Sequence, residues 1–272
     1  MSLSQAQFAD VAAKLGMPTE MPLTKDGLTS IYRAWCRNVG YDNISLLKYL
    51  DSGSRGDVPG MPGPMYFRLW LDQGVANFCW ANCEALGALL STYGFRTSRV
   101  IGTMGTGRNL LITAMPHGSL AAYVGEEKYI VDATFLCEEP LAIVPGEQTT
   151  AGAGSLQVWS DPDGQIRWQL PQSRFSGSFR IEDEDVRYER FEEEHRRTVD
   201  GLANGRLYRD KLYLRRNTGD GTVTYDHGHI IRRTADSFTI ERVPKGAARD
   251  ALKTFFGLGD AAVNDIPDAA LH

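Results

Sequence analysis

Residues 74–95 read GVANFCWANCEALGALLSTYGF, and this stretch decides how the rest of the chain is interpreted. From Cys79 to Tyr93 the apolar positions recur at steps of three and four, which predicts one long amphipathic helix. Gly94 comes next, and a glycine in the left-handed conformation is a common end of a helix. Cys79 is therefore expected in the first turn of this helix.

The sequence on the two sides of this helix follows different patterns. Before it, apolar spacing predicts helices at residues 4–15, 27–35, 41–50 and 66–73, and an exposed loop at 52–64. After it, alternating and β-branched residues predict strands at 97–103, 109–115, 119–124 and 128–132. The last third predicts a charged helix at 182–198, a hairpin of 207–217 and 222–234, a helix at 246–256 and a frayed end after 260. Together these elements predict an α+β protein of about three lobes.

The composition narrows the class of protein. The 272 residues are 42% hydrophobic and 23% charged, which is typical of a globular protein with a real core. The formal net charge of −5 argues against nucleic acid or an anionic membrane as the main partner. No apolar run approaches the roughly 20 residues of a membrane helix, and the first residues lack the pattern of a secretion signal. We therefore expect a cytoplasmic protein.

Cys79 is the strongest candidate nucleophile. At the start of a helix, unpaired backbone N–H groups and the positive end of the helix dipole favour a thiolate over a thiol. The alternative is a buried cysteine that acts as a small apolar residue. Cys83, one turn further into the helix, is a rival with less access to these N–H groups. With Cys36 and Cys137 these residues are expected to be thiols, because their spacing suits neither a disulfide nor a zinc site.

A thiol nucleophile needs a base, and His117 is the best-placed candidate. It lies at the head of a predicted hairpin that ends at Asp132. If the turn is centred between Val124 and Gly125, His117 and Asp132 face each other across the two strands. Asp132 would then orient the imidazole and stabilise its charged form. The alternatives are an ordinary turn histidine and a carboxylate at a strand end.

The other histidines are weaker candidates. His195 lies in a run of charged residues and is interpreted as part of a solvated helix face. His227 and His229 are predicted to share one face of a strand, but their neighbours Tyr225 and Asp226 do not complete a set of metal ligands. We therefore expect no metal site.

At these residues the chain resembles the arylamine N-acetyltransferase family, over nearly its whole length. The steps from Cys79 to His117 and from His117 to Asp132 are similar to the spacing of that family's Cys-His-Asp triad. Residues 132–135, DATF, look like its Asp-x-Gly-Phe segment, and residues 41–44, YDNI, are similar to its Pro-Phe-Glu-Asn-Leu signature.

The resemblance implies both an architecture and a chemistry. It implies a helical domain with the nucleophile, a β-barrel domain with the histidine and aspartate, and an α/β lid, around a papain-like Cys-His-Asp core; we place them at 1–94, 95–190 and 191–272. The implied reaction is ping-pong: the cysteine takes an acyl group from a thioester and passes it to an amine. No cofactor is bound permanently, and acyl-CoA or a phosphopantetheine thioester is the co-substrate. The expected substrate-binding residues are Phe78, Phe135 and Tyr41.

The sequence departs from the family beside the cysteine. The family's Arg-Gly-Gly is Val75-Ala76-Asn77 here, and its glutamate two residues after the cysteine is Ala81. Because an arginine and an acidic residue are lost together, no lone buried charge remains. The acceptor therefore need not be an arylamine.

The second interpretation is a release enzyme, an amide synthase or Dieckmann-type cyclase, that takes its acyl chain from an acyl carrier protein. A transglutaminase-like amidohydrolase and a catalytically idle binding protein are further alternatives.

Overall fold

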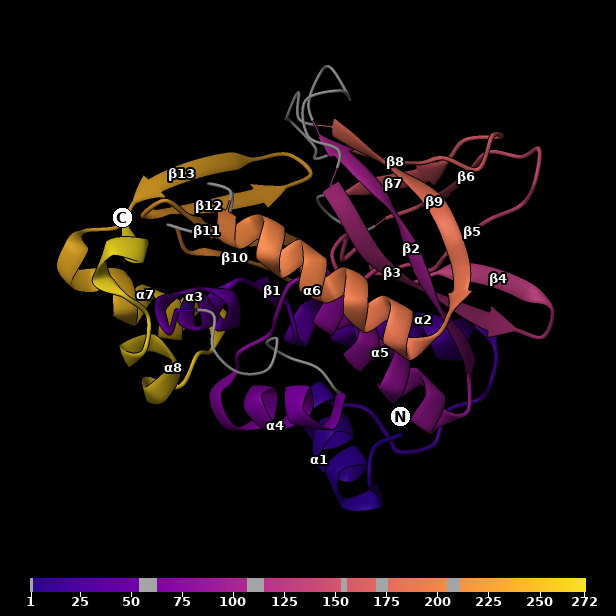
Figure 1. Ribbon diagram of the computed structural model, residues 1–272, viewed down its shortest axis with the longest axis horizontal. Helices are drawn as coiled ribbons and strands as arrows, with labels where there is room; N and C mark the ends of the chain where they lie inside the picture. Colours follow the sequence, from indigo (N-terminus) through magenta and orange to yellow (C-terminus); the bar gives the residue numbers. More distant parts are fainter. Residues whose placement is uncertain (1, 54–62, 107–114, 153–155, 170–175, 205–210) are drawn as a thin grey trace.

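The computed structural model describes residues 2–53, 63–106, 115–152, 156–169, 176–204 and 211–272 (Figure 1). Its α-helices are α1 (Gln5–Leu15), α2 (Lys25–Asn38), α3 (Ile44–Asp51), α4 (Gly63–Gln73), α5 (Cys79–Tyr93), α6 (Tyr188–Asn204), α7 (Ala248–Phe256) and α8 (Asp260–Asn264), with short 3-10 helices η1 (Lys245–Ala247) and η2 (Asp268–Leu271). Its strands are β1 (Tyr41–Asp42), β2 (Arg96–Thr106), β3 (Met115–Val124), β4 (Glu127–Ile130), β5 (Leu141–Ala142), β6 (Thr149–Ala151), β7 (Gln157–Ser160), β8 (Ile166–Gln169), β9 (Ser176–Val186), β10 (Tyr213–Asn217), β11 (Gly221–Asp226), β12 (His229–Thr234) and β13 (Phe238–Arg242). Within the described ranges no helix combines the length and the apolar character needed to cross a bilayer.

The N-terminal helices begin and end where the local sequence provides caps. The Ser4 hydroxyl accepts a hydrogen bond from the Gln7 N–H at 3.3 Å, and the Thr24 hydroxyl accepts one from the Gly27 N–H at 3.2 Å. At the end of α5, Gly94 has a φ of 100°, in the left-handed region. These local signals explain why the helices are readable from the sequence.

Helix α5 is the centre of the larger core, and its bounds are those that the sequence predicts. It contacts α4, α6, β2 and β3, so its residues are buried on nearly every side. Even Glu84 is only 3% exposed, and its carboxylate accepts two hydrogen bonds from Arg99 of β2, at 2.5 and 2.8 Å. A buried carboxylate paired in this way links the helix to the barrel.

Within the part of the chain that the structure describes, eight strands form the barrel. They make one antiparallel sheet in the order β5-β4-β3-β2-β9-β8-β7-β6. The end strands β5 and β6 lie against each other, and Thr149 of β6 donates a hydrogen bond to the Ala142 carbonyl of β5. The sheet is therefore a nearly closed barrel, which Figure 1 shows above the N-terminal helices. The predicted α+β class is confirmed.

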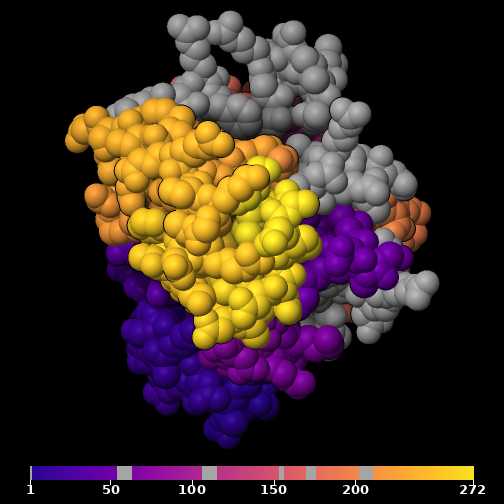
Figure 2. All heavy atoms as spheres, turned by 90° about the vertical axis from the view of Figure 1, so that its left-hand side faces the viewer, coloured from indigo at the N-terminus to yellow at the C-terminus, as the bar shows by residue number. Residues whose placement is uncertain are grey.

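A second, five-stranded sheet has the order β1-β10-β11-β12-β13. Its first strand comes from the N-terminal part of the chain, with Tyr41 opposite Arg215 and Asp42 opposite Leu214. One face of the sheet packs against α3, α7 and α8 in a second hydrophobic core. Figure 2 shows the C-terminal residues covering one side of the molecule, directly beside the N-terminal part. The division of the chain at residues 94 and 190 stays a prediction.

The predicted helix at residues 182–198 is wrong in its first part. Strand β9 extends to Val186, and α6 begins only at Tyr188. β9 pairs with β2 along this acidic stretch, with Asp183 opposite Ile101. Pairing inside the barrel therefore overrides the local helical preference.

Other elements of the sequence interpretation also differ. Residues 41–50 contain the short strand β1 before α3, and the strand predicted at 222–234 is two strands, β11 and β12, joined by a turn. The end after Asp260 is not frayed, because it forms α8 and η2 and buries Leu271. The predicted strand at 109–115 and loop at 52–64 lie almost wholly outside the described residues.

Candidate active site

Cys79 is the first residue of α5 and is 7% exposed. The backbone before it is held by side chains: the Asn77 side chain accepts the Phe78 N–H at 2.9 Å, and Asn82 accepts the Asn77 N–H at 3.1 Å. Asn82 also accepts the Tyr66 hydroxyl at 2.6 Å. Fixed backbone on both sides places the thiol at the positive end of the helix dipole.

Asp42 holds the same segment from β1. Its Oδ2 accepts the Ala76 N–H at 2.7 Å, and its Oδ1 accepts the Ile44 N–H at 3.0 Å. Burial raises the pKa of this carboxyl to about 6, against the effect of these two hydrogen bonds. Asp42 therefore connects the start of α3 to the approach of the candidate nucleophile.

His117 and Asp132 are in direct contact. His117 Nε2 lies 2.7 Å from Asp132 Oδ2, and both side chains are almost fully buried. The Ser119 hydroxyl donates to the same oxygen at 2.5 Å. The N–H groups of Thr134 and Phe135 donate to the other oxygen, at 2.7 and 3.1 Å. The carboxylate is thus fixed by four donors, and the imidazole is oriented by the carboxylate.

The same imidazole also interacts with the Cys79 thiol. Burial lowers the pKa of His117, but the Asp132 charge and hydrogen bonds to Asp132 and Cys79 outweigh it and raise the pKa to about 10. Burial raises the pKa of Asp132, but the His117 charge and its hydrogen bonds hold that pKa below its usual value.

The structure therefore brings Cys79, His117 and Asp132 together, although the hairpin register behind this prediction is wrong. The pairing of β3 with β4 places Val124 opposite Glu127, so the turn is centred one residue later than predicted. In this register Asp132 belongs opposite Ser119, and His117 reaches the carboxylate from the preceding position on the same strand face. A turn centred on Gly125 and Glu126 would have identified Ser119, which the sequence interpretation missed.

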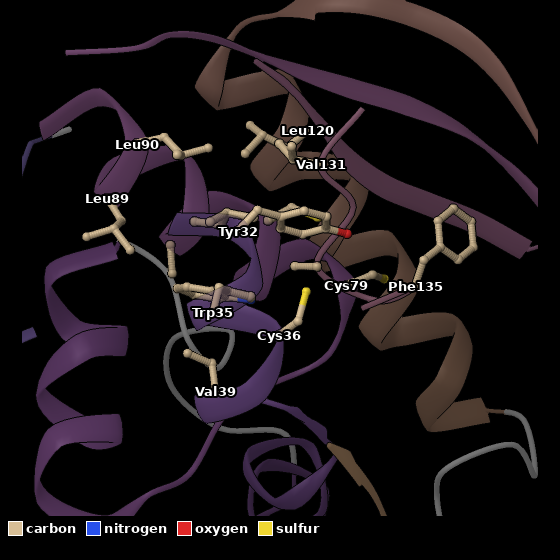
Figure 3. Close-up of a cluster of buried hydrophobic side chains, with 14 of the residues drawn as sticks. Tyr32, Trp35, Cys36, Val39, Cys79, Leu89, Leu90, Leu120, Val131 and Phe135 are labelled. Carbon is tan, nitrogen blue, oxygen red and sulfur yellow. The ribbon is translucent and has the colours of Figure 1, made fainter. Parts of the chain in front are cut away.

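Aromatic rings surround the imidazole. The Phe135 ring lies 5.9 Å and the Phe179 ring 5.0 Å from the His117 ring, centre to centre. Figure 3 shows Tyr32, Cys79 and Phe135 as members of the same buried cluster. The Tyr32 hydroxyl donates to the Asp132 carbonyl at 2.7 Å.

The three expected substrate-binding residues lie in different surroundings. Phe135 is beside His117, but the Phe78 ring packs against His195, 5.1 Å away. The Tyr41 ring packs against Tyr213 at 5.9 Å. Among the ring contacts of the described residues, only Phe135 of these three contacts the His117 imidazole. A role in substrate binding stays a proposal for all three residues.

Two interpretations of histidines are wrong. His195 is fully buried on α6, 6.4 Å from the Trp80 ring and stacked on it, and burial lowers its pKa to about 3. Its ring packs against Phe78 and Trp80, the residues on either side of Cys79 in the sequence, and not on a solvated helix face. His227 is not in a strand with His229: it has a φ of 49° in the turn between β11 and β12.

The rival cysteine has surroundings unsuited to a nucleophile. Cys83 is fully buried, its thiol donates to the Gly118 carbonyl at 3.4 Å, and burial raises its pKa well above the usual value. A thiol held in this form is a poor nucleophile. All four cysteines are buried free thiols.

Known proteins resemble this chain in sequence and in fold. A sequence model of the family described as N-acetyltransferase matches residues 72–262. Comparison with curated proteins gives no match. Among solved structures, the chain is similar to the arylamine N-acetyltransferase of Mycobacterium marinum in complex with CoA, with a TM-score of 0.78 and 14% identity over 97% of this chain and 96% of that chain.

Two further structures show the same fold. One is an arylamine N-acetyltransferase variant from Mycobacterium smegmatis, with a TM-score of 0.77 and 15% identity over 96% of this chain and 97% of that chain. The other is an arylamine N-acetyltransferase from Bacillus cereus, described as having a Cys-His-Glu catalytic triad, with a TM-score of 0.72 and 16% identity over 95% of this chain and 99% of that chain. Since the sequence match covers well over half of its length, the chain belongs to the arylamine N-acetyltransferase family.

Proposed function

We propose that the protein is a cysteine-dependent acyltransferase that forms an acyl-Cys79 thioester and passes the acyl group to an amine. One observation carries the proposal: a buried imidazole contacts the Cys79 thiol on one side and the Asp132 carboxylate on the other. A thiol, a base and an orienting carboxylate in this order are what nucleophilic acyl transfer requires.

The first half-reaction acylates the cysteine. The Cys79 sulfur attacks the carbonyl carbon of the donor thioester, and the thiol proton is held on His117. The carbon–sulfur bond to the donor breaks, and His117 gives its proton to the departing thiolate. The products are acyl-Cys79, the free donor thiol and a neutral imidazole oriented by Asp132.

The second half-reaction releases the acyl group. The acceptor amine attacks the acyl-Cys79 carbonyl, and neutral His117 takes the proton that the amine loses. The amide forms as the bond to the Cys79 sulfur breaks, which restores the thiolate and the imidazolium. Phe135, the ring beside His117, is the best-placed proposed contact for the acyl group.

The donor is proposed to be an acyl-CoA or a phosphopantetheine carried by an acyl carrier protein, since both present the same thioester arm. Val75 and Ala81, which replace charged family residues, are buried and apolar. This observation favours a second candidate, a release enzyme that accepts a carrier-bound chain and lets an internal nucleophile attack.

Intact-mass measurement after incubation with acetyl-CoA tests the first candidate. We expect one added acetyl group in the native protein and in Cys83→Ser, which removes the neighbouring thiol, and none in Cys79→Ser. Acetylation that persists in Cys79→Ser would contradict the assignment. Product release from an acylated carrier protein, without acylation by any small thioester, would favour the second candidate. Failure with both donors would leave an idle binding protein as the better interpretation.

A further inference from the structure

The loop that follows Asp132 is held by Arg215 of β10, which lies 80 residues beyond Phe135. The Arg215 Nη2 donates hydrogen bonds to the Thr134 carbonyl and, at 3.1 Å, to the Phe135 carbonyl. The peptide between Thr134 and Phe135 is therefore held at both ends: its N–H donates to Asp132, and its carbonyl accepts from Arg215.

Asn217, on the same face of β10, holds the next part of the loop. Its Nδ2 donates to the Leu136 carbonyl at 2.7 Å and to Glu138 Oε1 at 3.0 Å. Leu136 has a φ of 54° and Glu138 a φ of 65°. Residues other than glycine rarely adopt this conformation, so it persists only where the surroundings enforce it. Asn217 contacts both of these residues.

Helix α2 anchors the two ends of the same loop. The Tyr32 hydroxyl binds the Asp132 carbonyl, and the Arg37 guanidinium donates to Glu138 Oε2 at 2.9 Å. Glu138 is 3% exposed, so its carboxylate meets these partners where water is largely excluded. The loop is thus fixed by α2 at its ends and by β10 along its middle.

We propose that Arg215 and Asn217 are positioning residues that hold the Asp132 carboxylate against His117, so that the C-terminal sheet sets the geometry of the site. In the contacts of the described residues, neither side chain touches Cys79 or His117, and the effect passes through the loop. The inference rests on the proposed function, since it assigns a purpose to the orientation of Asp132.

A positioning role should change the titration of His117, whereas a purely structural role should not. If the loop loosens, the Asp132 charge moves away from a buried imidazole, and burial alone then disfavours the charged form of His117. Removal of either side chain should therefore move the titration of His117 toward lower pH, even in a protein that remains folded.

Nuclear magnetic resonance titration of the His117 ring tests this, with the signal assigned by its loss in His117→Gln. We expect the midpoint to fall by about one pH unit or more in Arg215→Met and in Asn217→Ala. Arg215→Lys keeps a donor for the carbonyls, so its midpoint should lie close to that of the native protein. The matched control is Arg232→Met, on the opposite face of the same sheet, where Arg232 pairs with Glu241 at 2.9 Å; it should leave the midpoint unchanged.

A midpoint in Arg215→Met and Asn217→Ala equal to that of the native protein would overturn the proposal. Thermal unfolding of each variant shows whether it is folded, and Asn217→Ala gives a result even if Arg215→Met does not fold. The titration uses no acyl donor. A failed acylation test with a shifted midpoint would therefore reject the proposed function alone, and successful acylation with an unshifted midpoint would reject the positioning role alone.

Discussion

The two oxygens of the Asp132 carboxylate have separate partners. Oδ2 accepts from His117 and from the Ser119 hydroxyl, while Oδ1 accepts two backbone N–H groups of the loop that follows. Hydrogen bonds to an ionised carboxylate favour the ionised form. A full negative charge therefore faces the imidazole where water is excluded, and the attraction is stronger there than at a surface.

This pairing makes the stability of the folded protein depend on pH. The pKa of His117 is raised to about 10 in the folded state, above its value in an unfolded chain. Its stabilising contribution is therefore complete below about pH 6.5 and is lost as the pH rises through about 10. Between these limits we expect the free energy of unfolding to fall by up to about 1.4 kcal/mol per pH unit from this group.

Urea unfolding of Cys79→Ala at pH 7, 8 and 9 measures the slope without titration of the thiol at the same site. The control is the double variant with His117→Gln, in which this part of the slope should disappear. Equal slopes in the two proteins would show that the imidazole is neutral in the folded state and that the charge assignment is wrong.

At the scale of elements, the strand that carries His117, β3, packs tightly against the two helices α5 and α6 at Gly118. A Cβ added to Gly118 would lie 2.5 Å from the Trp80 ring of α5 and 2.8 Å from the Phe191 ring of α6. Both rings are fully buried and stack edge-to-face at 4.8 Å, so neither can move aside without a cavity or a clash elsewhere. The close approach of these three elements depends on the glycine.

Gly118→Ala should therefore destabilise the protein by about 1–3 kcal/mol, the usual cost of overpacking a core. It should also slow alkylation of Cys79 by iodoacetamide, because the displaced strand moves the imidazole away from the thiol. Gly201→Ala is the matched control, since its Cβ would meet nothing within 4 Å and alanine favours a helix. A Gly118→Ala protein as stable and as reactive as this control would contradict the packing argument.

The sequence predicts α5 with its correct bounds because the period of its apolar residues and the final Gly94 are local signals. The partnership of His117 with Asp132 is also predicted, but the register is missed because a hairpin turn can shift by one residue without changing its composition. His195 is misjudged because its burial depends on the packing of α6 against Trp80, a contact between distant parts of the chain.

Residues that hold the site through contacts with distant parts of the chain are difficult to recognise in the sequence for the same reason. Arg215 and Asn217 act through hydrogen bonds to backbone groups that are remote in sequence, and no local pattern marks such a partner. Asp42 lies in the YDNI segment, but its hydrogen bond to the Ala76 N–H is equally remote. Phe78 and Phe135 both lie beside expected site residues in the sequence, but only the Phe135 ring contacts the imidazole, because the Phe78 ring packs against His195 of α6.

At the scale of the whole molecule, two hydrophobic cores are joined by elements that belong to both halves of the chain. Strand β1 comes from the N-terminal helices but pairs with β10 of the C-terminal sheet, and Ile44 and Leu47 of α3 lie in the second core. The Asn43 side chain donates to the Lys211 carbonyl and accepts from the Tyr213 N–H at this junction, both at 2.8 Å. Separate unfolding of either core would break these links.

We therefore expect one cooperative unfolding transition, which a defect far from the site should shift as a whole. Leu271 is 2% exposed at the end of the chain, and its carbonyl accepts the Tyr225 hydroxyl at 2.6 Å. Leu271→Ala should lower the free energy of unfolding by about 2–4 kcal/mol, whereas Leu23→Ala, at a residue 53% exposed, should change it by less than about 0.5 kcal/mol.

Tryptophan fluorescence and far-ultraviolet circular dichroism should give the same unfolding midpoint in each protein, because a defect in the second core lowers the stability of the first through β1 and β10. Two separate midpoints in Leu271→Ala would show that the cores unfold independently and that the C-terminal sheet does not govern the site.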